Sequence, residues 1–363
     1  MPRIKTLDVL RGFAVLGILF MNIYYHSVFE LGYVPLQVTP LSDNVIEVIN
    51  AFFIDGRFRA LFCLLFGVGL AILYDKHGQD DAFTLLKSRL NWLLIFGFIH
   101  SVFIFSGDIL VNYALAGLIV YREIGSSQEV LLKKAKTYFA IGFSLILLFA
   151  LIPSEPIYRD SDEYFEIINT WQSGYGEQLI QQIVFTIIMF VFSWVCFIWI
   201  TAGIVLFGVY LYRADFFNTG LSTKQLLASL LVVITISSID ALLRVNYVHL
   251  VELTMSIATF SGLVCALMYC HVFIKLNEKL TVLNSIFAPA GRMAFTLYIL
   301  QSIVFALFFR YFSPEFVHSA TRLDYIYLCL IFSVFQLVFA FFYLKLSKSG
   351  PIEWLWRKAY SAK

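Results

Sequence analysis

Charged residues are scarce in this sequence: Asp, Glu, Lys and Arg make up 14% of its 363 residues, against about 25% in soluble domains. Apolar residues reach 60%, and the mean hydropathy is +0.82. A soluble protein of this size cannot hide so much apolar surface. The composition therefore excludes a water-soluble enzyme. It also excludes a disordered chain, because disordered chains are polar and poor in aromatic residues.

Paired cysteines are lacking as well. None of the five has C-x-x-C or Cys/His metal spacing, and all lie in apolar stretches, at Cys63, Cys196, Cys265, Cys270 and Cys329. We interpret them as small buried side chains and predict no disulfide framework and no metal site. The motifs of soluble enzymes, such as Walker A and G-x-S-x-G, are missing. The net charge of +2 gives no indication of a nucleic-acid partner.

Apolar stretches, by contrast, recur along the whole chain. A helix needs roughly 20 apolar residues to span a bilayer. We identify ten such stretches, at about 9–28, 58–75, 90–105, 108–122, 135–153, 180–212, 225–243, 252–273, 286–310 and 324–346. The sixth is too long for one untilted span, so it is either one tilted or kinked helix or two short ones, which would make eleven. We predict an all-α, polytopic helical bundle in the lipid bilayer, formed by one domain over residues 1–363.

Basic residues predict the orientation, because Lys and Arg accumulate in cytoplasmic loops. With both termini cytoplasmic, all but six of the 26 Lys and Arg fall on the cytoplasmic side, the exceptions being Arg57, Arg59, Arg159, Arg244, Arg310 and Arg322. The first apolar stretch follows basic residues but lacks a small-x-small cleavage site, which favours an uncleaved helix. The expected location is the inner membrane of a bacterium.

Ionisable residues in the predicted spans mark candidate sites, since a charge in a bilayer costs about 2.5–3.5 kcal/mol on insertion scales. Asp8 and Arg11 share one face of the first span at its cytoplasmic mouth, where a phosphate-bearing ligand would arrive. They also fit a structural ion pair. Asn22 lies farther along nearly the same face and equally fits an interhelical hydrogen bond.

The segment from His100 to Tyr113 carries the strongest signal. Asp108 follows His100 after a short turn between two spans, so a helical hairpin brings the two together. A carboxylate beside an imidazole fixes its tautomer, which suits a general base. The alternatives are a structural histidine and an N-cap role for Asp108. Tyr113, one turn farther along, would extend the polar patch.

Three further residues are candidates for substrate binding. Arg57 and Arg59 lie on the outer side against the positive-inside rule, which predicts a carboxylate partner or a substrate anion. Gln301 lies inside the ninth span and is expected to face a cavity or another helix. Gly67 and Gly69, close after the two arginines, are expected to permit close helix packing.

These segments together resemble the YeiB-like bacterial membrane family, also called the domain of unknown function 418 family. The motifs run in order from Leu7 to about Tyr360: LDxxRGFA, Asn22, GRFRxLFxxLFG, His100 with GDILxxYA, TLYxxQS and GPxEW. Most lie in the N-terminal half, 1–125, and the C-terminal segment, 286–360. The centre, 133–285, carries little of the resemblance.

The family looks related to the transmembrane acyltransferases. That resemblance implies transfer of an acyl group from cytoplasmic acyl-CoA, as a co-substrate and not a bound cofactor, to an extracytoplasmic small-molecule or glycan acceptor by a membrane-embedded histidine. His100 and His26 are both candidates for that histidine. Asp8 and Arg11 would hold the donor, while Asn22, Arg57, Arg59, Tyr113 and Gln301 would contact substrate.

Two other functions fit the same residues. In a transporter, His100 and Asp108 would form a proton relay, and Arg57 or Arg59 an anion site. In a non-catalytic membrane partner, such as an immunity or sensing protein, they would be structural. The sequence also leaves open whether the chain forms a homodimer.

Overall fold

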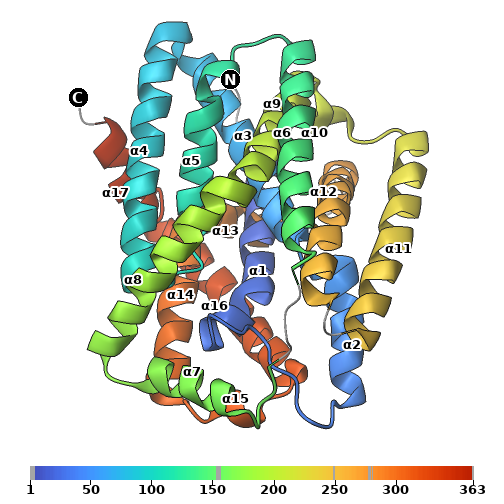
Figure 1. The fold of residues 1–363 in the computed structure, drawn as a ribbon. Coiled ribbons are helices and arrows are strands. Elements are labelled where there is room, and N and C mark those ends of the chain that lie inside the picture. Colours follow the sequence, from blue (N-terminus) through green and yellow to red (C-terminus); the bar gives the residue numbers. More distant parts are fainter. Residues whose placement is uncertain (1–4, 153–156, 248–249, 277–278, 280, 362–363) are drawn as a thin grey trace.

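The computed structural model describes residues 5–152, 157–247, 250–276, 279 and 281–361, and within them every regular element is helical (Figure 1). The α-helices are α1 (Lys5–Ser27), α2 (Leu41–Ile49), α3 (Arg57–His77), α4 (Gln79–Phe103), α5 (Leu110–Val120), α6 (Gln128–Phe149), α7 (Asp162–Gln172), α8 (Tyr175–Phe192), α9 (Ile198–Arg213), α10 (Phe216–Thr219), α11 (Thr223–Asn246), α12 (Val251–Leu276), α13 (Thr281–Arg292), α14 (Ala294–Leu307), α15 (Phe316–Ser319), α16 (Arg322–Leu346) and α17 (Pro351–Ser361).

Both ends of the chain lie at one end of the bundle (Figure 1), which we call the terminal end. The short helices α2, α7 and α15 lie at the other end, which we call the distal end. Two termini on one side are what an even number of crossings requires. The long helices run between these ends, so the fold is a polytopic helical bundle, as the sequence predicts.

Eight helical stretches of the described chain are long and apolar enough to cross a bilayer. They contain or overlap eight of the ten predicted spans. The remaining two correspond to α5 and α6, which are helical but fall outside these criteria. With 11 residues, α5 is shorter than the roughly 20 that a full crossing takes. The first half of α6 carries Lys133, Lys134 and Lys136.

The long sixth stretch is one helix with an irregular turn in its middle. A π-helical segment, Ser193–Phe197, joins α8 to α9, and a single apolar stretch runs from Tyr175 to Arg213. This arrangement matches the alternative of a single tilted or kinked helix and not the two separate spans. A second π-helical segment, Asn50–Ile54, follows α2, so the region before Arg57 extends the second span at the distal end.

Helix α1 lies at the centre of the bundle and packs against α3, α13, α14 and α16. Its crossing with α13 is very close. A Cβ atom at Gly291 would lie 1.7 Å from the carbonyl oxygen of Asp8, and one at Gly12 would lie 2.0 Å from that of Phe287. Helices α3 and α9 meet in the same way, since a Cβ at Gly67 would lie 2.0 Å from the carbonyl oxygen of Val205. Gly67 therefore permits close packing, as predicted. Gly69 does not, since a Cβ there would meet only the Arg11 side chain, at 3.4 Å.

A network of ion pairs ties the distal end together. Arg244 on α11 pairs with Asp240 at 2.8 Å, with Glu47 at 3.3 Å and with Asp55. Arg322, at the start of α16, pairs with Glu47 at 2.5 Å. The network joins α2, α11 and α16. Within it, the carboxylate of Asp55 pairs with Arg244.

We predict that Gly291→Ala lowers the free energy of unfolding by about 1–3 kcal/mol, because the added methyl group forces two backbones apart. Thermal unfolding in detergent measures the change. Gly176→Ala is the matched control, since a Cβ there meets nothing within 4 Å, and its melting temperature should stay the same or rise slightly. Equal melting temperatures for the two variants would contradict the close crossing.

Candidate active site

His100 and Asp108 form a buried pair in the bundle interior. The Nδ1 atom of His100 lies 2.7 Å from Oδ1 of Asp108, and the two side chains are 2% and 0% exposed. The other carboxylate oxygen accepts a hydrogen bond from the backbone N–H of Val111 at 2.8 Å, so Asp108 also caps the first turn of α5. The hairpin of α4 and α5 thus brings together the two residues that the sequence predicted to meet.

Tyr298 on α14 completes the surroundings of this pair. Its hydroxyl donates to Oδ1 of Asp108 at 3.4 Å and accepts from the N–H of Ile109 at 3.3 Å. Its ring centroid lies 5.2 Å from that of His100. The Nε2 atom of His100 is buried and has no hydrogen-bond partner in the described part of the chain. The pair therefore has one ring nitrogen fixed by a carboxylate and the other uncommitted, as a general base requires.

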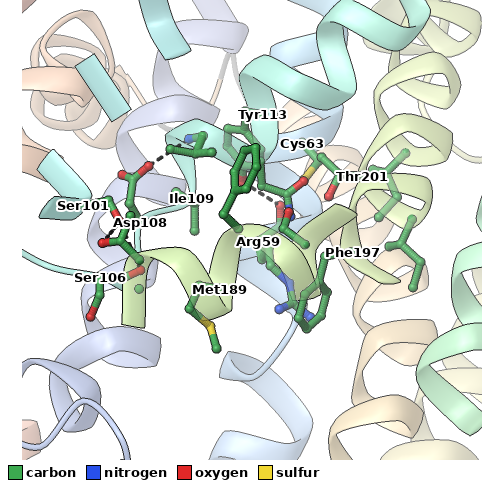
Figure 2. A pocket seen from close by; sticks show the side chains of 18 of the residues that line it. Arg59, Cys63, Ser101, Ser106, Asp108, Ile109, Tyr113, Met189, Phe197 and Thr201 are labelled. Carbon is green, nitrogen blue, oxygen red and sulfur yellow. Dashed lines mark hydrogen bonds between the residues drawn. The ribbon is translucent and has the colours of Figure 1, made fainter. Parts of the chain in front are cut away.

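A cavity of about 160 Å³ lies beside Asp108 (Figure 2). Its walls come from α3, α4, α5, α8, α9 and α12, and Arg59 and Cys63 contribute to them. Six hydroxyl side chains also line it: Ser101, Ser106, Thr186, Ser193, Thr201 and Thr259. We call it the inner cavity. Cys63, expected to be only a packing residue, is buried but lines this space.

A larger cavity, of about 770 Å³, lies at the terminal end. Five basic side chains line it, Arg11, Lys76, Arg89, Arg292 and Arg357, against two carboxylates, Asp8 and Glu353. Asp8 and Arg11 pair across 3.4 Å. The surplus of positive charge suits an anionic ligand, and the volume lies in the range of typical small-molecule sites. We call it the terminal cavity.

The two cavities share a wall next to the histidine. Ile109 and Tyr113 line both of them. Tyr113 is 2% exposed, and its ring stacks between Phe62 and Phe66 at centroid distances of 6.0 and 5.7 Å. Asp108 lines the inner cavity and Tyr298 the terminal one. His100 itself is in neither lining, and it reaches the cavity walls through its contact with Asp108.

Arg57 and Arg59, which the orientation predicted from the positive-inside rule places on the outer side, have different environments. Arg57 is 0% exposed and donates to the hydroxyls of Ser237 and Ser261 at 2.7 and 2.8 Å, and to two backbone carbonyls. It is outside the lining of both cavities, so its partners are protein groups that join α3 to α11 and α12. Arg59 lines the inner cavity, donates to Thr259 at 3.2 Å and lies over the Phe197 ring.

Three other candidates lie outside both linings. Gln301 is 1% exposed and donates to the carbonyl of Val15 and to Gln336, which matches the interhelical alternative. The amide nitrogen of Asn22 is buried on α1 without a described partner. His26 packs against Phe105 at 4.2 Å, and neither of its ring nitrogens has a described partner. Since His100 has a carboxylate and His26 does not, the geometry favours His100.

Glu353 is a residue whose importance the sequence reasoning missed. Its carboxylate accepts from the backbone N–H groups of Phe295 and Thr296 at 2.8 and 3.0 Å, and from the Thr296 hydroxyl at 2.5 Å. It thereby caps α14, the helix that carries Tyr298. Burial raises the pKa of this carboxyl, although these hydrogen bonds oppose the shift. The GPxEW motif contains Glu353, but nothing in its spacing points to a distant helix N-terminus.

No group of three or more His, Cys, Asp or Glu side chains in the described ranges is arranged to hold a metal ion. The fold and the site thus define a class: a multi-pass helical membrane protein with a buried His–Asp pair beside two adjacent cavities.

Comparison with known proteins gives the family. The chain belongs to the DUF418 family, described as "Protein of unknown function (DUF418)", whose model matches residues 211–363. It is 31% identical to an uncharacterized 39.9 kDa protein of Bacillus acidopullulyticus, over 98% of this chain and 93% of the relative. YeiB of Escherichia coli and YxaH of Bacillus subtilis are each 27% identical, over 99% and 98% of this chain and 96% and 94% of their own. No solved structure matches.

We predict that Arg57→Ala destabilises the fold by about 2–3 kcal/mol, because it leaves buried hydroxyls and carbonyls without their charged donor. Arg59→Ala should cost less than about 1 kcal/mol, since the Arg59 side chain makes one hydrogen bond among the described residues and a ring contact at a cavity wall. Chemical or thermal unfolding in the same detergent compares the two variants. An equal loss in both would contradict these assignments.

We also predict that Glu353→Ala lowers the free energy of unfolding by about 1–2 kcal/mol, the usual cost of losing a helix cap. Thermal unfolding measures it, with Glu163→Ala on the exposed start of α7 as the control. A melting temperature as high as that of the control variant would show that the cap contributes nothing.

Proposed function

We propose that the protein transfers an acyl group from cytoplasmic acyl-CoA to an acceptor on the outer side of a bacterial inner membrane. One observation carries the proposal: the buried His100–Asp108 pair lies beside two adjacent cavities, with Asp108 in the wall of the small hydroxyl-lined one and its hydrogen-bond partner Tyr298 in the wall of the large basic one. An enzyme that joins a large anionic donor to a small acceptor across a membrane requires such an arrangement. The opening motif with Asp8 and Arg11, the part of the chain that most resembles the transmembrane acyltransferases, supports the same reaction.

The terminal cavity would hold the donor. Its five basic side chains match the phosphates of CoA, and all belong to the set that the positive-inside rule places in the cytoplasm. One of them, Arg89, also makes a cation–π contact, because its guanidinium lies 4.4 Å from the Trp356 ring centroid. Trp356 and Tyr360, both on α17, line the same cavity. The thioester would then point toward Tyr113 and the inner cavity.

His100 would act as the general base. Its Nε2 atom takes the proton of the acceptor hydroxyl, and the hydroxyl oxygen attacks the thioester carbonyl carbon. The carbon–sulfur bond breaks, and the departing CoA thiolate takes the proton back from the imidazolium. The products are an ester and CoA thiol. Asp108 holds the ring tautomer and stabilises the positive charge on His100 during the transfer.

We predict that acyl-CoA raises the melting temperature of the purified protein. A ligand present at 100 times its Kd stabilises the folded state by about 2.7 kcal/mol. The shift should be much smaller in Arg11→Ala, which removes a cation from the terminal cavity, and unchanged in Arg122→Ala, an exposed arginine outside its lining. If acetyl-CoA and longer acyl-CoAs at millimolar concentration give no shift, the proposed donor is wrong.

Turnover separates the two histidines. His100→Gln should lower release of CoA thiol by roughly 10²–10⁴-fold, the usual contribution of acid–base catalysis, while acyl-CoA binding persists. His26→Gln should retain most of the activity, because no carboxylate contacts His26. A loss of pH-driven solute accumulation in His100→Gln, with exchange preserved and no thiol release in wild type, would instead indicate a proton-coupled transporter.

A further inference from the structure

The inner cavity has a composition that points to the chemistry of its ligand. Its volume, about 160 Å³, is close to that of a cavity that accommodates one benzene ring. It is too small for a CoA molecule and suits a single ring or a short polyol. Six hydroxyl side chains line it, and hydroxyls both donate and accept hydrogen bonds. A ligand that matches this wall presents several hydroxyl groups of its own.

Two of these hydroxyls are buried and uncommitted. Ser106 is 2% exposed and Ser193 is 8% exposed. Their Oγ atoms make no hydrogen bond to any described residue, and neither does the side-chain oxygen of Asn112, which lines the same cavity. Buried polar groups are normally hydrogen-bonded. Unpaired groups on one cavity wall therefore indicate a polar ligand.

A positive charge faces the same space. Arg59 has no carboxylate within ion-pair distance in the described part of the chain; it donates to Thr259 and lies 5.4 Å from the Phe197 ring centroid. Figure 2 shows Arg59 beside Phe197 at the cavity wall. A guanidinium inside a membrane protein normally pairs with a carboxylate or with backbone carbonyls, as Arg57 does, whereas the Arg59 side chain has a single hydroxyl partner among the described residues. Its planar donors match a carboxylate or phosphate.

The irregular turn between α8 and α9 shapes this wall. The π-helical segment begins at Ser193 and ends at Phe197, and both residues line the inner cavity. Single π-turns inside α-helices are frequent at functional sites. Here the turn places the unpaired hydroxyl of Ser193 and the Phe197 ring, which packs on Arg59, at the same cavity.

We infer that the inner cavity binds a small anionic polyol, a compound with several hydroxyls and one carboxylate or phosphate that Arg59 pairs with. This inference rests on the proposed function and names the acceptor: the acidic group lies at Arg59, and one hydroxyl lies toward Asp108 and His100. This acceptor site is separate from the donor site, because the terminal cavity takes no part in binding the polyol.

The test is binding of defined probes to the purified, full-length protein, measured as a shift in melting temperature. Glycerol 3-phosphate and glucuronate represent the phosphate and carboxylate forms, with glycerol and glucose as neutral matches and inorganic phosphate as the anion alone. We expect at least one anionic polyol to stabilise the protein more than its neutral match and more than inorganic phosphate. The comparison of the two anionic probes identifies the acidic group.

Single-residue variants show which of the two cavities holds the bound probe. Arg59→Gln should weaken binding of the anionic polyol about 10–100-fold, the loss expected for a hydrogen-bonded charge, and Ser193→Ala should weaken it less. Arg11→Ala should leave it unchanged, whereas a loss in Arg11→Ala would place the probe in the terminal cavity and overturn the inference. Arg122→Gln serves as the control for charge alone.

The outcomes also separate this inference from the proposed function. If acyl-CoA stabilises the protein but no anionic polyol does at millimolar concentration, the acceptor class is wrong and the donor stands. If neutral and anionic probes bind equally well, and Arg59→Gln binds both like wild type, the role of Arg59 is wrong. If acyl-CoA fails to bind while the Arg59-dependent site persists, the site is real but acyl transfer is not its function.

Discussion

A polar or charged side chain in an apolar interior is stable only when another group satisfies it, and this constraint governs the whole structure. Arg57 is surrounded by hydroxyls and carbonyls from three helices. Arg244 draws carboxylates from α2, α11 and the Asp55 turn. Where the protein supplies fewer partners, as at Arg59, Ser106 and Ser193, the interior opens into a cavity. Unsatisfied polar groups and a cavity together therefore mark candidate binding residues, because Asn22 and His26 also lack described partners but line neither cavity.

The site depends on helices that meet from opposite ends of the chain. The hairpin of α4 and α5 supplies His100 and Asp108, and α14 supplies Tyr298. Glu353 on α17 caps α14 and also lines the terminal cavity. Helix α14 thus connects Glu353, in the wall of the terminal cavity, to Asp108, the carboxylate that orients His100, through Tyr298. The close crossing of α1 and α13 at Gly12 and Gly291 packs the segment that leads into α14 against the central helix.

Several features could be predicted from the sequence because they depend on local pattern. Apolar length predicts the bundle, and Lys and Arg positions predict both termini at one end. The short turn between two spans predicts the His100–Asp108 contact, because antiparallel neighbours joined by a tight turn must touch near that turn. The length of the sixth stretch indicates an irregular helix, although the sequence leaves the π-turn and its place at Ser193 undecided.

Sequence reasoning did not separate Arg57 from Arg59. The two arginines lie two residues apart on one helix, so their side chains leave that helix in different directions. Arg57 contacts α11 and α12, whereas Arg59 lines the inner cavity. Sequence reasoning also predicted that Gln301 and Asn22 contact substrate. In the structure Gln301 joins three helices, and both residues lie outside the cavity linings.

The sequence by itself determined the class of fold, the position of both termini at one end and the histidine–carboxylate pair, since hydrophobicity, charge and a short hairpin act over neighbouring residues. Only the tertiary structure decided which polar residues share a cavity, which arginine the protein itself surrounds, and that Glu353 caps a helix more than fifty residues away along the chain. These depend on contacts between distant helices, whose register is fixed by side-chain packing in three dimensions and not by periodicity along the chain.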